Sequence, residues 1–178
     1  SVQGYVRSAL IRQAKNEAHL NRQRYVELGD VFVWKMPGFE QDPVQVRDTI
    51  EKVKKRKTLI LDLRGNGGGY VDTLLALIEN VFDHEVRIGD LKRRKEQKEM
   101  KAKSRGKEAF AAKVLVLIDS ESGSAAELFA RVVQLEKRGT VLGDRTSGKV
   151  MRSRLYGHQM GIETIVLYGV SVTDADVV

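Results

Sequence analysis

Cysteine is absent from this chain of 178 residues, and proline occurs only twice. Without cysteine the chain has no disulfide, no thiolate nucleophile and no cysteine-ligated zinc site, while oxidising and reducing compartments both remain open. Long apolar runs are also missing. The longest, such as 74–78 and 114–118, fall far below the ~20 residues that cross a bilayer. We therefore expect a single folded domain with a real core and no membrane span.

Histidine is scarce as well, and the three histidines are too scattered for a metal site. His19, His84 and His158 share no ligand spacing, and Asp83-His84 fits a helix end better than half of a catalytic triad. We expect no metal and no redox cofactor. The first residues lack both an initiator methionine and the charged-then-apolar pattern of a signal peptide, as in a processed product or a fragment.

The net charge of +7 is concentrated in one segment. Nine basic residues lie between Lys92 and Lys107 against only Glu96 and Glu99, so this segment accounts for the whole excess. It has few apolar residues and no aromatic side chain that could stack on a base. We therefore expect a solvated, partly helical or mobile basic arm at residues 91–108, in preference to a nucleic-acid or acidic-membrane contact.

Apolar periodicity and turn residues predict alternating strands and helices. Asp42-Pro43 is typical of a helix N-terminus, and Val46, Ile50 and Val53 recur on one face behind it. The predicted elements are strand 30–34, a helix from 43 to the basic run 54–57, strand 58–63, a helix after the turn 64–69, strand 113–119, helix 124–137, strand 140–143 and strand 164–172. This order predicts an α/β fold of βαβ units around a mostly parallel sheet. Residues 1–24 are predicted to form a helical lead-in, and residues 25–178 the core.

Three of the predicted turns follow strands and are expected to meet at one edge of the sheet. They are residues 65–69, 123–124 and 146–149. The carboxyl ends of parallel strands share an edge, and ligands bind there. A site made from three separate loops is therefore expected at this edge.

Lys149 fits two different chemistries. Residues 143–149 read Gly-Asp-Arg-Thr-Ser-Gly-Lys, which is most of a phosphate-binding P-loop. Position 150 is valine, however, so the hydroxyl that binds magnesium is missing, and residues 151–157 lack the apolar stripe of the helix that a P-loop needs. Residues 65–70 imitate a dinucleotide motif in the same way, with Tyr70 at the third glycine position. The sequence therefore favours the other chemistry, a lysine acting as general base.

Ser124 also has two interpretations. At a strand-to-helix turn its hydroxyl would face backbone N–H groups suited to an oxyanion, as acyl transfer requires. Alternatively, Ser124-Ala-Ala-Glu127 is a capping box, which contributes about 1 kcal/mol to helix stability and needs no catalysis. The tetrapeptide alone favours the cap.

Three motifs occur in order along the chain: Leu61-Asp-Leu-Arg-Gly-Asn-Gly-Gly-Gly69, Asp119-Ser-Glu-Ser-Gly-Ser-Ala-Ala-Glu127 and Gly143-Asp-Arg-Thr-Ser-Gly-Lys149. Together they resemble the carboxyl-terminal processing (tail-specific) serine peptidase family, over residues 25–172. The resemblance implies a crotonase-like or Clp-like α/β core that cuts polypeptides with a Ser-Lys dyad. It assigns Ser124 as the nucleophile, Lys149 as the general base, Gly68 and Ala125 as backbone donors of the oxyanion hole, and Thr146 as the residue that orients the lysine.

The dyad has a clear physical requirement. A free lysine has a pKa of about 10.4, so a lysine base needs that value lowered to about 7–8, which takes about 4 kcal/mol of desolvation. The resemblance therefore implies an apolar pocket around Lys149. Each oxyanion-hole donor lowers the barrier by about 3–4 kcal/mol, and glycine at position 68 would let the backbone come close.

The chain departs from the family pattern at three places. Ser153 stands where some members have a glutamine that holds the lysine, and Arg152 and Arg154 flank it. Their charges would lower the lysine pKa if they were close; alternatively, the dyad is poorly oriented. Gly123 stands where alanine is usual, which would loosen the turn that carries Ser124. Residues 1–24 leave no room for the PDZ module that commonly precedes this core and captures substrate carboxyl termini.

Two functions are compatible with these residues. The first is a serine-type endopeptidase that acts on polypeptide substrates through Ser124 and Lys149. The second is a non-catalytic peptide-binding or scaffold domain of the same fold. A homo-oligomer is compatible with either, and the resemblance points to the cell envelope, in a periplasmic or extracytoplasmic position.

Overall fold

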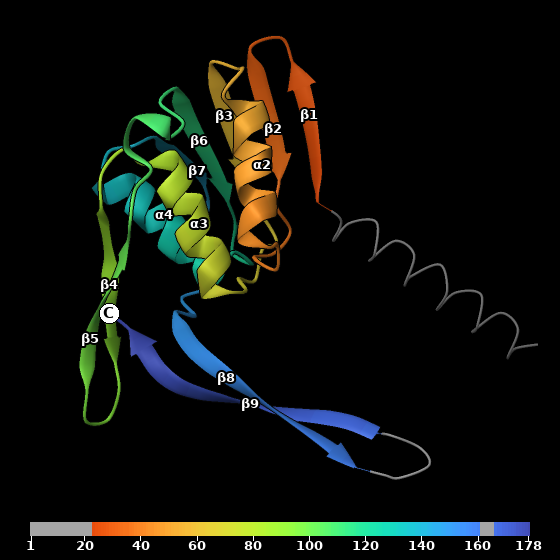
Figure 1. Cartoon of the computed structure of the whole chain (residues 1–178), viewed down its shortest axis with the longest axis vertical. Helices are drawn as coiled ribbons and strands as arrows, with labels where there is room; N and C mark the ends of the chain where they lie inside the picture. The colour runs from red at the N-terminus through yellow and green to blue at the C-terminus, as the bar shows by residue number, and fades with distance from the viewer. Residues whose placement is uncertain (1–22, 161–165) are drawn as a thin grey trace, which may run out of the picture.

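A central sheet of five strands organises the molecule (Figure 1). The computed structural model describes residues 23–160 and 166–178, with the backbone alone at 154–155, 157–160 and 166–171. In spatial order the strands are β1 (Arg24–Leu28), β2 (Val31–Lys35), β3 (Thr58–Asp62), β6 (Lys113–Ile118) and β7 (Thr140–Gly143). Strands β2, β3, β6 and β7 run parallel, and β1 pairs antiparallel with β2. The predicted α/β fold with a mostly parallel sheet is confirmed.

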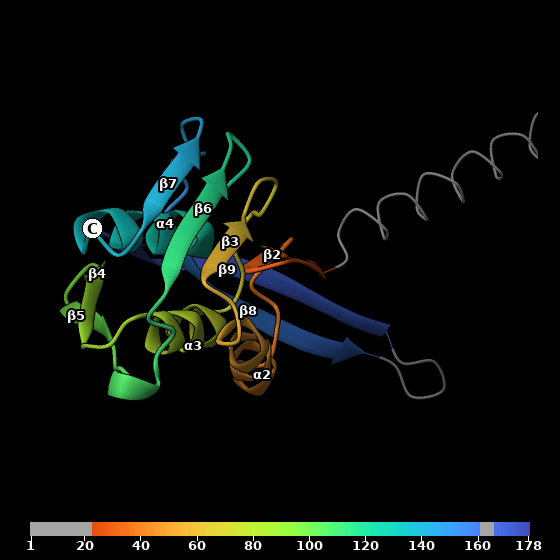
Figure 2. The ribbon, with the colours of Figure 1, turned by 90° about the horizontal axis from the view of Figure 1, so that it is seen from above.

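Three helices cover this sheet (Figures 1 and 2). They are α2 (Pro43–Val53), α3 (Val71–Val81) and α4 (Ala125–Leu135). Helix α2 begins as predicted: the Asp42 carboxylate accepts the Val44 N–H at 2.7 Å, and the Gln45 side chain accepts the Asp42 N–H at 3.3 Å. Helix α4 ends earlier than the predicted helix 124–137, and Lys137 just beyond it adopts a φ of +52°.

The core lies between the sheet and the helices. Alternate strand residues such as Phe32, Trp34 and Leu61 are fully buried, and they belong to one cluster with Leu77 of α3 and Phe129 of α4. Full burial of a large apolar side chain stabilises the fold by roughly 1.5–3 kcal/mol relative to exposure. The loops that follow the central strands therefore start from fixed positions. Within the described residues, none of the helices is both long and apolar enough to cross a membrane.

A second sheet contains the segment that the sequence predicts to be a basic arm. Its strand order is β5-β4-β9-β8, with β4 (Val86–Lys92), β5 (Gln97–Ala102), β8 (Met151–Met160) and β9 (Val166–Val177). Residues 91–108 therefore form most of a β-hairpin and a short 3₁₀ turn, so the prediction of a partly helical arm is wrong. One face of β5 is buried through Met100 and Ala102, at 6% and 1% exposure. Charges on the other positions conceal this alternation.

Strands β8 and β9 form a long twisted ribbon that extends away from the body (Figure 1). At its base the ribbon joins the β4–β5 hairpin, where Leu91 of β4 pairs with Val177 of β9. The predicted strand 164–172 overlaps β9, whereas the sequence does not predict β8. Because β8 begins two residues after Lys149, the lysine loop leads into a strand and not into the helix of a P-loop. The predicted lead-in lies outside the described residues up to position 22, and Arg24 begins β1.

Candidate active site

The three predicted turns meet at one edge of the central sheet, joined by backbone hydrogen bonds. The Gly123 N–H donates to the Asn66 carbonyl at 2.8 Å, which joins the turn after β6 to the turn after β3. The Ser147 N–H donates to the Ser122 carbonyl at 3.0 Å, which joins the loop after β7 to the turn after β6. The turns converge because β3, β6 and β7 are adjacent parallel strands.

Ser124 lies at the N-cap of α4 in a backbone conformation that residues with a side chain rarely adopt. Its φ is +53° and its ψ is −117°. Such a conformation costs about 1–3 kcal/mol and persists only where surrounding contacts enforce it. A sharp strand-to-helix turn of this kind exposes a serine hydroxyl above a sheet. Ala125 is the first helical residue, so its N–H has no partner within α4.

Gly68 packs closely against Ser124. Its φ of +105° suits glycine, and a Cβ at this position would lie 2.6 Å from the Ser124 Cβ. The Gly68 N–H, which the resemblance assigns to the oxyanion hole, donates to the Asn66 Oδ1 at 2.9 Å. Asn66 is fully buried, and its amide donates to the Met36 carbonyl at 2.7 Å. Gly68 is therefore beside the serine, but its donor is occupied in this conformation.

Glu127 connects the turn that carries Ser124 to the loop that carries Lys149. The sequence predicts only its role in the helix cap. Its Oε2 accepts the N–H of Ser124 at 2.8 Å and the N–H of Lys149 at 2.9 Å, and its Oε1 accepts the Gly148 N–H at 2.7 Å. The residue is 8% exposed, so these charge-assisted bonds act in a low dielectric. Ser124 and Glu127 thus form the capping box that the sequence indicates, with the Ser124 side chain facing the N–H of Glu127 and the Glu127 carboxylate accepting the N–H of Ser124.

The backbone of Lys149 is hydrogen-bonded at the site, but its side chain is not. Its N–H is held by Glu127 at 2.9 Å, whereas its side chain is exposed. No hydrogen bond joins the Lys149 ammonium to the Ser124 hydroxyl or to any other residue in the part of the chain that the structure describes. The expectation of an apolar pocket around this lysine is therefore wrong for the described conformation.

The residues considered as supports for the lysine lie elsewhere. Thr146 is half-buried and lines a groove between α4 and β7. The Ser153 hydroxyl lies 3.4 Å from the Thr173 hydroxyl, across the β8–β9 ribbon. The Arg152 guanidinium forms a bidentate pair with Asp174, at 2.9 and 2.6 Å. The charge of Arg152 is therefore matched within the ribbon and is not directed at the lysine.

Gly123 does not loosen the serine turn as the sequence suggests. A Cβ at this position would lie 2.8 Å from the Ser147 Oγ and 3.4 Å from the Gly67 carbonyl oxygen. Both neighbouring loops thus pack against position 123, and an alanine would have to displace the Ser147 hydroxyl. The side chain of Arg154, which belongs to another departure from the family pattern, lies outside the described residues.

A groove of about 390 Å³ opens in front of Ser124. Most of its lining is apolar or aromatic: Tyr70, Val71, Leu74, Leu91, Met100, Leu128, Met151 and Val177 lie around Gly69, Ser124, Ala125, Arg152 and Ser153. The starts of α3 and α4 bound the groove together with the β4–β5 hairpin and the base of the ribbon. A mostly apolar groove with a few polar groups is the usual form of a ligand site.

Asp119 fixes the glycine turn from the end of β6. Its Oδ1 accepts the Gly65 N–H at 2.9 Å and the Glu121 N–H at 3.1 Å. Burial raises the pKa of this carboxyl, but the Gly65 and Glu121 N–H groups and the Ser122 hydroxyl outweigh burial and hold the pKa below its ordinary value. Asp119 is therefore ionised at neutral pH and accepts from both turns.

Asp62 has the same role at the end of β3. Burial raises the pKa of its carboxyl, but hydrogen bonds from Arg64 and the charges of Lys35 and Arg64 hold it below its ordinary value. The Arg64 side chain donates to both Asp62 oxygens, at 2.9 and 2.8 Å. Among the described residues, no cluster of three or more histidine or carboxylate side chains could hold a metal ion.

The structure is therefore an α/β domain with a mostly parallel sheet, in which Ser124 lies strained at a strand-to-helix turn. The model of peptidase family S41 matches residues 30–166. The match covers more than half of the chain, and the chain belongs to peptidase family S41. The family and the core fold that the three motifs predict are thereby confirmed.

Similar proteins include serine proteases that are longer than this chain. A probable CtpA-like serine protease of Staphylococcus epidermidis is 27% identical over 143 residues, which are 78% of this chain and 29% of that protein. The solved structure of the photosystem II D1 C-terminal processing protease matches with a TM-score of 0.62 and 22% identity, over 82% of this chain and 37% of that chain. Mature CPAF matches with a TM-score of 0.61 and 15% identity, over 86% and 45% of the two chains. The structural matches establish a shared fold, and the chain spans less than a third of the curated relative.

Proposed function

We propose that this chain is the catalytic core of a serine-type endopeptidase that hydrolyses peptide bonds of polypeptide substrates. The observation that carries the proposal is the conformation of Ser124. Its backbone is strained at the start of α4, Gly68 packs closely against it, and it lines an apolar groove. A serine that served only as a cap would take the extended conformation usual at that position, without strain. Membership in a peptidase family supports the same conclusion.

In the proposed reaction, the neutral Lys149 amine takes the proton of the Ser124 hydroxyl while Oγ attacks the scissile carbonyl carbon. The electron pair of the carbonyl bond moves to its oxygen, and the Ala125 N–H at the helix start donates to that oxyanion. The lysine then gives its proton to the departing amine, and the acyl group remains on Ser124. Water releases the acyl group through the same proton transfers.

The reaction requires two changes from the described conformation. The Gly68 N–H, the second proposed oxyanion donor, has to leave the Asn66 Oδ1. The Lys149 side chain has to be covered by apolar atoms, because a lysine base needs a desolvated site. Glu127 already places the Lys149 backbone beside the serine turn. Thr146 remains the residue proposed, from the family motif, to orient the lysine.

A second candidate function is a non-catalytic peptide-binding domain of the same fold. The exposed Lys149 side chain, which forms no hydrogen bond with the Ser124 hydroxyl, favours this candidate. Such a domain would keep the groove in front of Ser124 and would lack an aligned base. Binding of a polypeptide without cleavage is its signature.

Labelling and cleavage distinguish the two candidates. A biotinylated fluorophosphonate should label the full chain at Ser124, and the same chain should cleave an unfolded polypeptide such as casein. Ser124→Ala should abolish labelling and cleavage. Lys149→Ala should lower the rates of both by about 10³-fold or more, because the hydroxyl then has no base.

Two exposed residues, one in the turn of Ser124 and one outside the groove, provide matched controls. Ser120→Ala removes a hydroxyl from the same turn as Ser124, and Lys103→Ala removes an exposed ammonium beyond β5. Both variants should cleave at the rate of the unsubstituted chain. If the chain binds the unfolded polypeptide but is neither labelled nor active, the peptidase proposal fails and the binding domain remains.

A further inference from the structure

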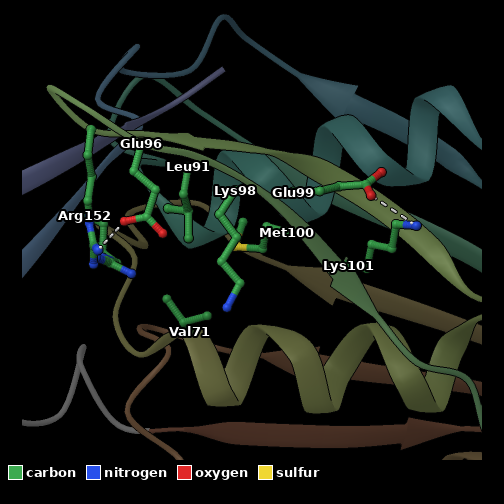
Figure 3. A pocket seen from close by; sticks show the side chains of 9 residues that line it. Val71, Leu91, Glu96, Lys98, Glu99, Met100, Lys101 and Arg152 are labelled. Carbon is green, nitrogen blue, oxygen red and sulfur yellow. Dashed lines mark hydrogen bonds and ion pairs between the residues drawn. The ribbon is translucent and has the colours of Figure 1, made fainter.

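A second groove lies along the β4–β5 hairpin (Figure 3). It has a volume of about 390 Å³. It shares the lining residues Val71, Leu91, Met100 and Arg152 with the groove in front of Ser124 and adds Arg93, Glu96, Lys98, Glu99 and Lys101. The two grooves are therefore contiguous. A polypeptide that crosses Ser124 in an extended conformation would continue over the hairpin.

Most cations of this second groove already have a carboxylate partner. The pairs are Arg93 with Glu96 at 3.0 Å, Lys101 with Glu99 at 3.0 Å, and Arg152 with Asp174 at 2.6 Å. Among the residues that the structure describes, Lys98 is the cation of this groove without an ion pair. The groove therefore offers one unmatched positive charge.

Lys98 lies on the inward face of β5. Side chains alternate along a strand, and the next two positions on its face, Met100 and Ala102, are buried. Figure 3 shows Lys98 extending toward Val71, whereas Glu99 and Lys101 pair with each other and point away. Lys98 itself is exposed, so its ammonium attracts an anion at the open side of the groove with the modest strength of a surface charge. An inward lysine on an edge strand also discourages strand pairing, and the experiment below separates the two roles.

We propose that Lys98 forms an anion subsite that binds a carboxylate of the polypeptide substrate, a few residues from the bond cut at Ser124. The inference rests on the proposed peptidase function. The carboxylate is either an aspartate or glutamate side chain or the terminal carboxylate, because both present the same pair of oxygens. A lysine acts as a flexible point charge, so the subsite selects for negative charge and not for one residue type.

Fluorogenic peptides with a background of alanine and leucine test the subsite. A single glutamate or glutamine is moved along the peptide, and each peptide is made with a free and with an amidated carboxyl terminus. We expect the full chain to cleave glutamate peptides about two- to fivefold faster than glutamine peptides at one position, which is the upper part of the range for an exposed ion pair. Lys98→Glu should reverse this preference. Lys95→Met removes a charge from the hairpin turn outside the groove and should keep it.

Fluorescence anisotropy of the same peptides with Ser124→Ala measures binding without cleavage. If peptides are cut with equal rates for glutamate and glutamine at every position, or if Lys98→Glu keeps the preference, the subsite is overturned while the peptidase proposal stands. If nothing is cut but Ser124→Ala binds glutamate peptides more tightly, and adding Lys98→Glu removes that preference, the subsite stands and the peptidase proposal fails. A preference that disappears on amidation assigns the subsite to the terminal carboxylate, and one that survives assigns it to an acidic side chain.

Discussion

The serine turn (residues 120–124) and the lysine loop (residues 144–149) are held in different ways. The serine turn follows β6 in the interior of the sheet. In the neighbouring turn, Gly68 packs against Ser124, and the Asn66 carbonyl accepts the Gly123 N–H. The lysine loop follows β7 at the sheet edge, and its functional side chain is exposed. The fold thus preorganises Ser124, the proposed nucleophile, whereas the position of Lys149, the proposed base, depends on the buried Glu127 carboxylate and on the atoms that cover the lysine side chain.

Removal of the Glu127 carboxylate is the most direct way to break the link between the two segments. Glu127→Ala leaves the N–H groups of Ser124, Gly148 and Lys149 without their acceptor. We expect the free energy of unfolding to fall by about 3–4 kcal/mol, because three part-buried, charge-assisted hydrogen bonds are lost together. Urea denaturation measures the loss, and peptide cleavage should disappear with it.

Two further variants calibrate this result. Glu127→Gln keeps one acceptor oxygen and should lose about half as much stability. Glu121→Gln changes an exposed carboxylate in the serine turn and should alter the free energy of unfolding by less than about 0.5 kcal/mol. If Glu127→Ala is as stable as the unsubstituted chain, other contacts hold the lysine loop, and the contrast between the two segments is lost.

Gly67 and Gly68 test how closely the glycine turn fits the serine. Gly68→Ala would place a Cβ 2.6 Å from the Ser124 Cβ and force a side chain into a φ of +105°. We expect it to lose about 2–3 kcal/mol of stability and to slow labelling of Ser124. A Cβ on Gly67 meets nothing within 4 Å, so Gly67→Ala should stay within about 0.5 kcal/mol. If Gly67→Ala and Gly68→Ala lower the melting temperature equally, the serine turn tolerates displacement.

The sequence predicts those parts of the fold whose buried side chains repeat with a regular period. The cap at Asp42 and the strand β3 are confirmed, because a local hydrogen bond and a continuous apolar run leave clear signals, although only one face of β3 is fully buried, through Leu59 and Leu61. Strand β5 is hidden, since only Met100 and Ala102 mark its buried face among charged neighbours. Strand β8 is hidden because it pairs in a ribbon away from the core, where no apolar alternation is required.

Convergence of the three turns is also predictable, because the ends of parallel strands share an edge. The hydrogen bonds from the Gly148 and Lys149 N–H groups to Glu127 are not predictable, because they join positions 21 and 22 residues apart. A motif gives the backbone position of a lysine, but the solvation of its side chain depends on which atoms pack over it. The exposure of Lys149 therefore could not be read from residues 143–149.

Acid should weaken the hydrogen bonds that Asp119 accepts from the glycine turn and from the serine turn. The pKa of Asp119 is held below its ordinary value of 3.8 in the folded chain. Its contribution to stability is therefore fully present above that value and is lost as the pH falls through the lowered pKa. We expect Asp119→Asn to cost about 1 kcal/mol at neutral pH and to reduce the loss of stability on acidification. Urea denaturation over a pH series measures this, and an unchanged acid slope in Asp119→Asn would contradict it.

Lys149→Met has the smallest expected effect on stability and gives the sharpest contrast with the serine turn. Its side chain is exposed, and its backbone bond to Glu127 survives the substitution. The free energy of unfolding should therefore change by less than about 0.5 kcal/mol. Cleavage should still fall by about 10³-fold or more, because methionine cannot accept the serine proton. Denaturation and peptide hydrolysis are measured on the same preparation. A stability loss as large as that of Glu127→Ala would mean that the lysine side chain is buried in solution, and that the base is as preorganised as the nucleophile.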